Sequence, residues 1–307
     1  MQHLHDIALT ILKGNLNVQS SETLLILTDI HKQDIAQIFY KAGQSITAKT
    51  MLMVMPLLDK SGQEPIQAVS TLMTNVDVTL CITSHSLTHT AARKNACEQG
   101  GRVATMPGVT MDMLEQGALH ADAQEIEDMV GKYVHLLDAA KNIRIDKDGH
   151  TLTFSVENRL GIRSTGVIRQ AGEHGNIPSG ESYIAPLETS ANGEILVDGS
   201  IANIGVLKEP LLLKITNGRL EEAIGPDGPQ LLALLGEGNG RIIAEFGIGA
   251  NKSAILCGNV LEDEKVYGTI HIAFGSNKPF GGANMADVHI DCVVKNPTVY
   301  FDGQQVI

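Results

Sequence analysis

The stretch LLILTDIHKQDIAQIFYKAG, residues 24–43, places a short apolar run directly before a helix-like segment that ends in a glycine. The run LLILT has the length of a buried strand, and Gly43 stands where a helix C-cap is expected. Comparable apolar runs recur at regular intervals along the first half, namely MLMVM (51–55), VTLCIT (78–83) and RVATM (102–106). This spacing predicts right-handed βαβ units and a parallel sheet covered on both faces, closed by a helix over about 121–141.

The character of the sequence changes at about residue 143. IRIDKDGHTLTFSV reads as two strands around an Asp-Gly turn, and LLLKITNGRLEEAI reads as two strands around an Asn-Gly turn. One helix is expected around PDGPQLLALLGE, with Pro226 near its start. We therefore predict an α/β protein with two domains, a parallel-sheet α/β domain over residues 1–142 and an α+β, hairpin-rich domain over residues 143–307.

Composition and charge exclude several classes of partner. The net charge is −12, the aromatic content is 4% and tryptophan is absent, which argues against a nucleic acid or an anionic membrane as partner. No apolar run reaches the length of a bilayer span, and the N-terminal sequence does not resemble a secretory signal. No CxxC pair or zinc-ribbon spacing occurs, so reduced thiols and a cytoplasmic location are expected. The four cysteines are Cys81, Cys97, Cys257 and Cys292.

The strand-like stretch DVHIDCVV (287–294) carries a histidine and an aspartate two positions apart. Side chains alternate faces along a strand, so His289 and Asp291 point the same way while apolar residues occupy the opposite face. Polar residues on the exposed face of an edge strand would produce the same pattern. The pair alone therefore permits a metal site without requiring one.

Three further ionisable residues stand in strand-like or glycine-rich context, namely Glu181 in NIPSGESYIAP, Glu245 in RIIAEFGIGAN and His271 in YGTIHIAFG. An unpaired charge is costly to bury, and convergence on a cation removes that cost. Each residue could instead be satisfied separately by an arginine, a backbone amide or water. Taken together with His289 and Asp291, the set predicts a divalent-metal site in the second domain.

The donor types narrow the metal and leave two arrangements open. Two imidazoles and carboxylates without thiolates suit Zn, Mn, Co or Fe. His271, His289 and Asp291 could form the two-histidine, one-carboxylate face that holds a single Fe(II). Addition of Glu181 and Glu245 would supply enough carboxylate to bridge two ions about 3.5–4 Å apart, the arrangement that activates water.

In the first domain, SHSLTHTAARKNA contains a candidate acid/base residue, His89. If the helix begins near Ser86, His89 lies in its first turn, at the carboxyl edge of the preceding strand, where open α/β sheets bind ligands. His89 would then act as a general acid/base or a substrate anchor. A histidine at the protein surface or in the capping region is the alternative.

The segment LEDEKVYG carries four consecutive charges, Glu262 to Lys265. Charge runs of this kind are usually solvated turns, and that is the expectation here. The alternative is that Glu264 or Lys265 faces the site as a base or a carboxylate binder. Neither GEGNG nor FGIGAN completes a dinucleotide-binding loop, and no nucleophile elbow occurs.

Read in order, several segments resemble one superfamily of metalloenzymes. They are SLTHTAARKNA, RVATMPGVTMDM, SGESYIAP, AEFGIGAN, LEDEKVYGTIHIAFG, FGGAN and VHID. The set is similar to the thermophilic-type leucyl metallo-aminopeptidases and to their relatives, the 2,5-dihydroxypyridine 5,6-dioxygenases. The resemblance covers most of the chain.

What the resemblance implies for the site differs between the two groups. The aminopeptidases imply a two-metal site of two glutamates, two histidines, an aspartate and a tyrosine; five of these roles correspond to Glu181, Glu245, His271, His289 and Asp291. In place of the tyrosine, the chain offers Lys278. The dioxygenases imply one Fe(II) held by two histidines and an aspartate, which His289 and Asp291 fit, and an acid/base histidine that corresponds to His89.

These observations lead to a cytoplasmic metalloenzyme whose substrate is a small molecule or a short peptide. The first interpretation is an aminopeptidase-like hydrolase with Zn, Co or Mn ions, in which Glu264 carries the proton. The alternatives are an Fe(II) ring-cleaving dioxygenase for a dihydroxypyridine-like substrate, and a non-catalytic protein that binds a small ligand. The resemblance also implies a homo-oligomer, a dimer or larger.

Overall fold

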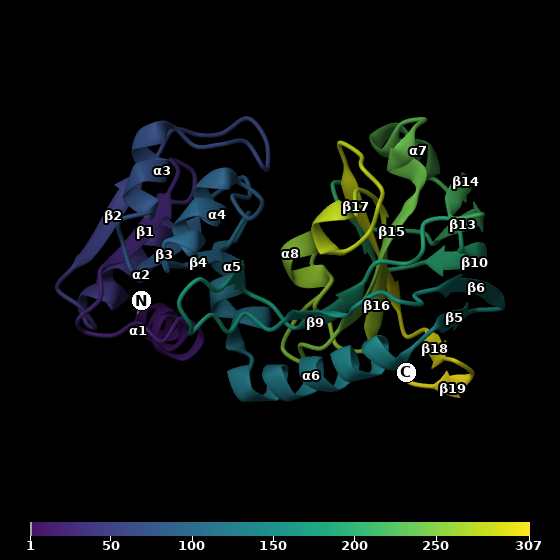
Figure 1. The fold of residues 1–307 in the computed structure, drawn as a ribbon, viewed down its shortest axis with the longest axis horizontal. Helices are drawn as coiled ribbons and strands as arrows, with labels where there is room; N and C mark the ends of the chain where they lie inside the picture. Colours follow the sequence, from purple (N-terminus) through teal and green to yellow (C-terminus); the bar gives the residue numbers. More distant parts are fainter. Residues whose placement is uncertain (1) are drawn as a thin grey trace. The chain divides into compact units, whose positions relative to one another are not determined.

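The computed structural model describes residues 2–307, which divide into two compact units (Figure 1). The first unit comprises the described residues up to Glu125 together with Thr165–Ser179, and the second comprises Ile126–Ser164 and Gly180–Ile307. No helix within residues 2–307 has both the length and the apolar composition that a bilayer span needs.

The first unit is built on a five-stranded parallel sheet, here called sheet I. Its strands lie in the order β2 (Thr50–Val54), β1 (Leu24–Thr28), β3 (Val78–Ile82), β4 (Arg102–Thr105) and β8 (His174–Asn176). The first four strands coincide with the four apolar runs of the sequence, which confirms the predicted parallel sheet. Their residues are mostly buried because helices cover the sheet.

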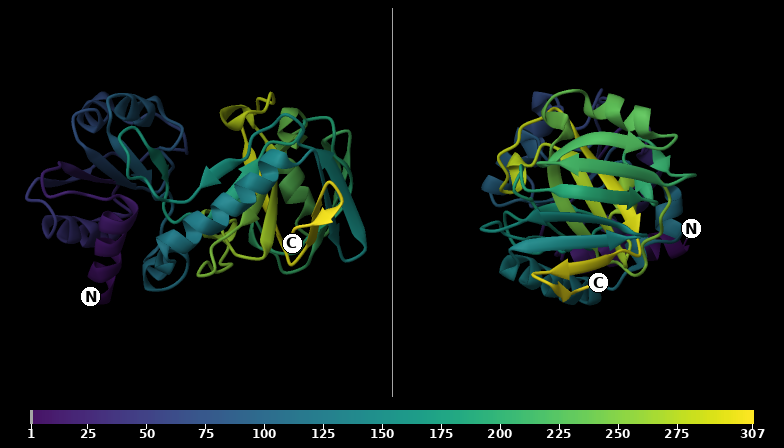
Figure 2. Two further views of the ribbon diagram at one scale, coloured as in Figure 1. Left: turned by 60° about the horizontal axis from the view of Figure 1, so that its bottom comes forward. Right: turned by 90° about the vertical axis from the view of Figure 1, so that its right-hand side faces the viewer.

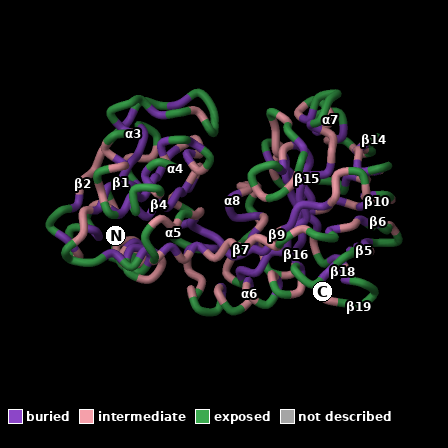
Figure 3. Tube along the Cα trace, viewed as in Figure 1, coloured by how far each residue is buried: buried purple, intermediate pink, exposed green. Residues whose placement is uncertain are grey.

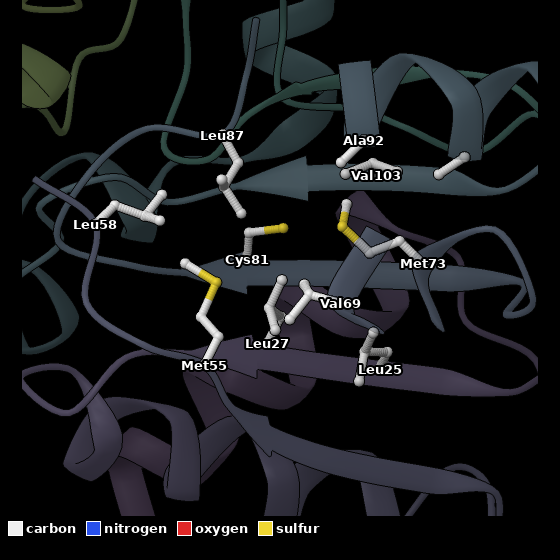
Figure 4. Packing of buried hydrophobic residues seen from close by; sticks show 11 residues of the cluster. Leu25, Leu27, Met55, Leu58, Val69, Met73, Cys81, Leu87, Ala92 and Val103 are labelled. Carbon is white, nitrogen blue, oxygen red and sulfur yellow. The ribbon is translucent and has the colours of Figure 1, made fainter. Parts of the chain in front are cut away.

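The helical segments of this unit are α1 (Gln2–Thr10), the π-helical turn η1 (Ile11–Asn15), α2 (Gln33–Gln44), α3 (Gln67–Met73), α4 (Ala91–Glu98), α5 (Met111–Glu115) and the 3₁₀ turn η2 (Ala118–His120). Three of them, α2, α3 and α4, connect successive strands, while the others precede β1 or follow β4. Leu25 and Leu27 of β1 pack with Val69 of α3 and Ala92 of α4 in one apolar cluster (Figure 4). The alternating side chains of β1 thus divide between the two faces of the sheet.

Two features of the first unit differ from the sequence-based expectation. Helix α4 begins at Ala91 rather than near Ser86, because the Thr90 side chain caps it by accepting a hydrogen bond from the Arg93 amide. His89 therefore precedes the helix. The return segment Thr165–Ser179 supplies β8 to the edge of sheet I, a pairing between distant parts of the chain that no local pattern reveals.

The second unit contains two antiparallel sheets of seven strands each. Sheet II has the order β14 (Arg219–Ile224), β13 (Leu211–Thr216), β10 (Asn192–Val197), β6 (His150–Ser155), β5 (Asn142–Lys147), β18 (Thr298–Phe301) and β19 (Gln304–Gln305). Sheet III has the order β12 (Gly205–Val206), β11 (Ser200–Ile201), β17 (His289–Lys295), β16 (Thr269–Gly275), β15 (Ile243–Gly249), β9 (Glu181–Ile184) and β7 (Ile162–Ser164). Figure 2, right, looks onto these sheets.

Both predicted hairpins are confirmed in sheet II. Asp148 and Gly149 join β5 to β6, and Asn217 and Gly218 join β13 to β14; all four residues have positive φ. This is the backbone of the primed two-residue turns that match the twist of antiparallel strands. The fold class predicted from the sequence, a parallel-sheet region followed by a hairpin-rich region, is therefore confirmed.

Sheets II and III pack face to face around aromatic side chains. The ring centroid of Phe246 on β15 lies 5.5 Å from that of Phe154 on β6 and 6.3 Å from that of Phe301 on β18. Because side chains alternate along β15, its odd-numbered residues point away from this core. Strands β15 and β16 are nevertheless buried along their whole length (Figure 3), so the outer face of sheet III is also covered.

Five helical segments complete the second unit: α6 (Ala123–Ala139), α7 (Gly228–Leu235), η3 (Asn239–Arg241), α8 (Val260–Asp263) and η4 (Lys278–Phe280). Most of α6 belongs to this unit, where the carbonyl of Val130 accepts a hydrogen bond from the Ser182 hydroxyl of β9. Helix α7 confirms the expected helix, with Pro229 rather than Pro226 in its first turn.

Candidate metal centre

The outer face of sheet III gathers ionisable side chains from four neighbouring strands. Strand register places Glu245 and Asp291 on either side of Ala273, and it places His271 opposite Gly247. His289 follows on β17, two residues before Asp291 and on the same face, as the alternation predicts. Glu181 of β9 pairs with Gly249. The chain thus brings carboxylates and imidazoles from β9, β15, β16 and β17 onto one surface.

Two glycines of β15 provide the space into which neighbouring groups pack on this face. A Cβ at Gly247 would lie 1.9 Å from His271 Nε2, so the imidazole lies directly over the backbone of β15. A Cβ at Gly249 would lie 2.0 Å from the Val266 carbonyl oxygen, so the following loop can close down on the strand. The glycines of the FGIGAN segment therefore serve close packing above the sheet.

The ionisable groups on this face lie within contact distance of one another. His271 Nε2 is 3.2 Å from Glu245 Oε1 and 3.6 Å from Glu181 Oε2. His289 Nε2 is 3.4 Å from both Glu245 Oε2 and Asp291 Oδ1. Glu245 thus lies between the two imidazoles, and the five residues predicted from the sequence form a single cluster, hereafter the metal cluster.

Glu262, Asp263 and Lys265 of the charge run are buried and Glu264 is half-buried, so the expectation of a solvated turn is wrong. Asp263 accepts hydrogen bonds from the backbone amides of Cys257 and Gly258, and Glu262 accepts one from Ile255. The acidic side chains therefore organise the loop before β16. As a result of this packing, Glu264 and Lys265 at the end of the charge run lie next to the metal cluster.

Lys265 is the cation of this run that enters the site. Its side chain is fully buried, and Nζ donates to Glu181 Oε1 at 2.8 Å and also contacts Glu264 Oε1. The alternative for Lys265, a carboxylate binder in the site, therefore matches the geometry. Glu264 also lies beside the cluster, as the alternative for that residue required.

Three buried polar atoms of the cluster make no hydrogen bond within residues 2–307. They are Glu181 Oε2, His271 Nδ1 and Asp291 Oδ1. Buried polar groups without partners are uncommon and costly. Two overlapping groups of donors come within metal-binding reach, Glu245–His271–Asp291 and Glu181–Glu264–His271. Oxygen and imidazole donors without thiolate fit a divalent first-row ion, so the residues present suit a metal.

The hydrogen bond of His289 fixes which nitrogen serves the cluster. Nδ1 lies 2.9 Å from the Ser276 carbonyl oxygen, which can only accept, so Nδ1 carries the proton. Nε2 is then the ring nitrogen that faces Glu245 and Asp291. Such a bond from the far ring nitrogen to a carbonyl is usual for metal-binding histidines because it sets the tautomer and the ring orientation.

Electrostatics in the metal-free cluster favour protons on both imidazoles. Burial alone would lower the pKa of His271, but its hydrogen bond to Glu245 and the nearby carboxylates raise it to about 9. The pKa of His289 is likewise raised well above its usual value, since Asp291 and Glu245 outweigh the effect of burial. Burial also opposes ionisation of Asp291, yet His289 lowers the pKa of Asp291 to about 2.

Glu264 behaves in the opposite way. Burial, followed by repulsion from the Glu181 carboxylate, raises the pKa of Glu264 to about 8, although Lys265 opposes this change. A carboxyl group with a pKa near neutrality can both accept and return a proton. Glu264 therefore has the property expected of the proton carrier predicted from the sequence, a role that stays a prediction.

The chain carries Lys278 at the position where the resemblance to the aminopeptidases implies a tyrosine. Lys278 lies in η4, exposed, with Nζ 3.5 Å from Met285 Sδ. Tyr183 of β9 instead pairs with Gly247 on the site face, and its pKa is raised well above the usual value by burial and by the cluster carboxylates. The sequence contained a signal for Tyr183, because a residue two positions after Glu181 in a strand shares its face.

His89 belongs to the first unit, where it is exposed and lies just before α4. A second imidazole is nearby, since burial, Arg93 and His89 together lower the pKa of His174 on β8. The assignment of His89 as an acid/base residue stays a prediction.

Comparisons with known proteins point to one superfamily. A family model described as 2,5-dihydroxypyridine 5,6-dioxygenase (NicX) matches residues 10–307. The solved structure of 2,5-dihydroxypyridine dioxygenase from Pseudomonas putida KT2440 superposes with a TM-score of 0.85 at 17% identity, covering 99% of this chain and 95% of that chain. Wild-type AmpT from Thermus thermophilus superposes with a TM-score of 0.69 at 16% identity, covering 100% and 99%. A search of curated protein sequences found no significant match. At such identities the structural likeness establishes the shared fold.

Proposed function

This chain belongs to the family of 2,5-dihydroxypyridine 5,6-dioxygenases, and we propose that it is a mononuclear Fe(II) dioxygenase that opens a dihydroxypyridine-like ring. We thus prefer the dioxygenase, which was an alternative in the sequence analysis, to the aminopeptidase-like hydrolase, which was the first interpretation. The observation that carries the proposal is the convergence of two imidazoles and two carboxylates in a chain of this family. These donors are His271, His289, Glu245 and Asp291.

The chain's own residues have definable tasks in such a reaction. His271 and His289, with Glu245 and Asp291, would hold the ion, which when bound supplies the redox chemistry that allows a ring to react with dioxygen. Ser276 orients His289 through Nδ1. The Phe280 ring lies edge-on to both His289 and Tyr183, with centroids at 5.8 and 5.4 Å, and so forms an apolar wall beside the cluster.

Proton transfer falls to Glu264 and His89 in this proposal. A hydroxyl on the ring loses its proton more readily when a carboxylate of matched pKa lies near, and the Glu264 carboxyl has that property. His89 is retained as the second acid/base candidate. Replacement of His89 by alanine is expected to reduce turnover by about 10²-fold or more without loss of bound metal.

The decisive experiment measures oxygen consumption. The protein is purified without oxygen or chelators, loaded with Fe(II) and mixed with 2,5-dihydroxypyridine in an oxygen-electrode cell. Cleavage of the C5–C6 bond with both oxygen atoms retained in the product requires one O₂ per ring, with both atoms of labelled O₂ recovered in the product. Ring loss without oxygen uptake, or no reaction of the Fe(II)-loaded protein, would contradict the proposal.

A metal-dependent hydrolase is the second candidate, and one observation favours it. Glu181 and Glu264 add carboxylates beyond those needed for a single ion, as a water-activating pair of ions requires. Release of p-nitroaniline from aminoacyl p-nitroanilides by the Zn-, Co- or Mn-loaded protein would support this candidate. A folded protein that retains no metal would favour the non-catalytic ligand-binding alternative.

A further inference from the structure

We propose that Lys265 is a built-in counter-cation that limits the metal cluster to one divalent ion. The inference rests on the proposed function and specifies its nuclearity. Lys265 would set the number of ions that the cluster binds, so we describe it as a positioning residue rather than a catalytic one.

His271 belongs to both donor groups, Glu245–His271–Asp291 and Glu181–Glu264–His271. The same nitrogen, Nε2, faces Glu245 at 3.2 Å and Glu181 at 3.6 Å. A ring nitrogen has one lone pair and binds one ion. Two ions cannot both take their imidazole from this atom, so one of the two groups is left with carboxylates alone.

One of the two donor groups already contains a cation. Lys265 Nζ occupies Oε1 of both Glu181 and Glu264. The ammonium is fully buried, so it is shielded little by solvent. A second divalent ion between the same carboxylates would lie beside this positive charge, and repulsion between close charges is strong away from water. Lys265 thus supplies positive charge at the place where a second ion would bind.

The other donor group, Glu245–His271–Asp291, is left to hold the single ion. Glu245 and Asp291 lie on either side of His289 Nε2, and the hydrogen bonds and ion pairs of Lys265 go to Glu181 and Glu264 instead. Asp291 Oδ1 has no hydrogen-bond partner within residues 2–307, and an ion held by Glu245, His271 and Asp291 would satisfy it.

The experiment counts ions with Mn(II) as the probe. Metal-free protein is dialysed against excess Mn(II), bound metal per chain is measured by elemental mass spectrometry, and the electron paramagnetic resonance spectrum reports whether ions are coupled. The wild-type protein should bind one Mn(II) with an uncoupled signal. Lys265→Met should bind two, a doubling accompanied by an exchange-coupled signal, because the freed carboxylates then need a cation.

Two variants serve as controls. Lys265→Arg keeps the charge and should retain one ion. Lys147→Met removes another largely buried lysine that is bound by two carboxylates, Asp148 at 3.3 Å and Asp198 at 3.1 Å, on sheet II away from the metal cluster. It should also leave one Mn(II) per chain. Circular dichroism confirms that each variant is folded.

Two Mn(II) ions in the wild-type protein would overturn the inference, and this measurement needs no variant to fold. One ion in folded Lys265→Met would overturn it as well. The proposed function is judged separately by oxygen uptake. An enzyme that consumes oxygen with two ions bound refutes only the role of Lys265, and a single-ion protein without oxygen uptake refutes only the dioxygenase.

Discussion

Sheets II and III carry the same kinds of charged pair in opposite surroundings. On sheet II, His150 Nδ1 lies 2.9 Å from Glu194 Oε2, and the two side chains are 30% and 40% exposed. On sheet III, His271 Nε2 lies 3.2 Å from Glu245 Oε1, and the side chains are 0% and 8% exposed. The separations are alike. Burial without full hydrogen bonding, rather than the residue types, distinguishes a site from a solvated surface pair.

The largest expected effect is on metal retention. His271→Ala removes the one donor that both groups share, so the affinity for Mn(II) or Fe(II) should fall by more than about 100-fold. His150→Ala, the matched change on sheet II, should leave the affinity unchanged. Bound metal after gel filtration, measured by elemental mass spectrometry, tests both. Equal metal content in the two variants would remove the distinction between the sheets.

An intermediate effect is expected from a single methyl group beneath the imidazole. Gly247→Ala places a Cβ against His271 Nε2, and the resulting overpacking should destabilise the fold by about 1–3 kcal/mol and displace the ring from the cluster. Gly238→Ala is the control, because its Cβ meets nothing within 4 Å. Thermal unfolding and Mn(II) titration measure the two consequences. A Gly247→Ala variant with wild-type affinity would show that the ring does not need this position.

The smallest effect, taken per pH unit, is a dependence of metal binding on pH. The folded, metal-free protein keeps His271 protonated up to its raised pKa of about 9, and a metal requires the neutral imidazole. Apparent affinity should therefore rise by about tenfold per pH unit between pH 7 and 9 for each proton released. Titration against a competing chelator at pH 7, 8 and 9 measures this slope. An affinity that is flat over this range would contradict the raised pKa.

The same proton has the opposite effect on the stability of the metal-free protein. Its folded-state pKa lies above the usual value near 6.5, so the stabilisation is complete below about pH 6.5 and is lost as pH rises through about 9. Metal-free protein should thus unfold more easily as metal binding strengthens. Urea unfolding at the same three pH values provides the check.

Local patterns were sufficient where local physics decides the structure. The turns at Asp148-Gly149 and Asn217-Gly218 require positive φ. Asp-Gly and Asn-Gly pairs favour that backbone, so the sequence predicts both turns directly. The alternation of His289 and Asp291 likewise gave their common face. The chemistry of the donors was readable for the same reason, since carboxylates and imidazoles in apolar strands have few satisfactory partners.

Tertiary packing decided what local patterns could not predict. The charges of Glu262 and Asp263 looked solvated, but the backbone amides of a single loop bind them and bury the run. The start predicted for helix α4 was too early in the chain. The side chain of Thr90 caps the helix, so the helix-like residues before Thr90 stay outside it. The membership of Lys265 and Tyr183 in the site depended on where the loop and strand β9 came to lie.

Because the return segment Thr165–Ser179 belongs to the first unit, neither unit is encoded by one continuous stretch of the gene. Strand β8 completes sheet I only after the β5–β6 hairpin of the second unit has been translated, so β4 emerges from the ribosome with one edge bare. A gene cut between residues 142 and 143 would leave that edge permanently open to pairing with other chains. It would also separate α6 from the strand that it packs against. Domain exchange with relatives would therefore have to transfer two segments of a unit together, through three junctions, and a single crossover point would not suffice.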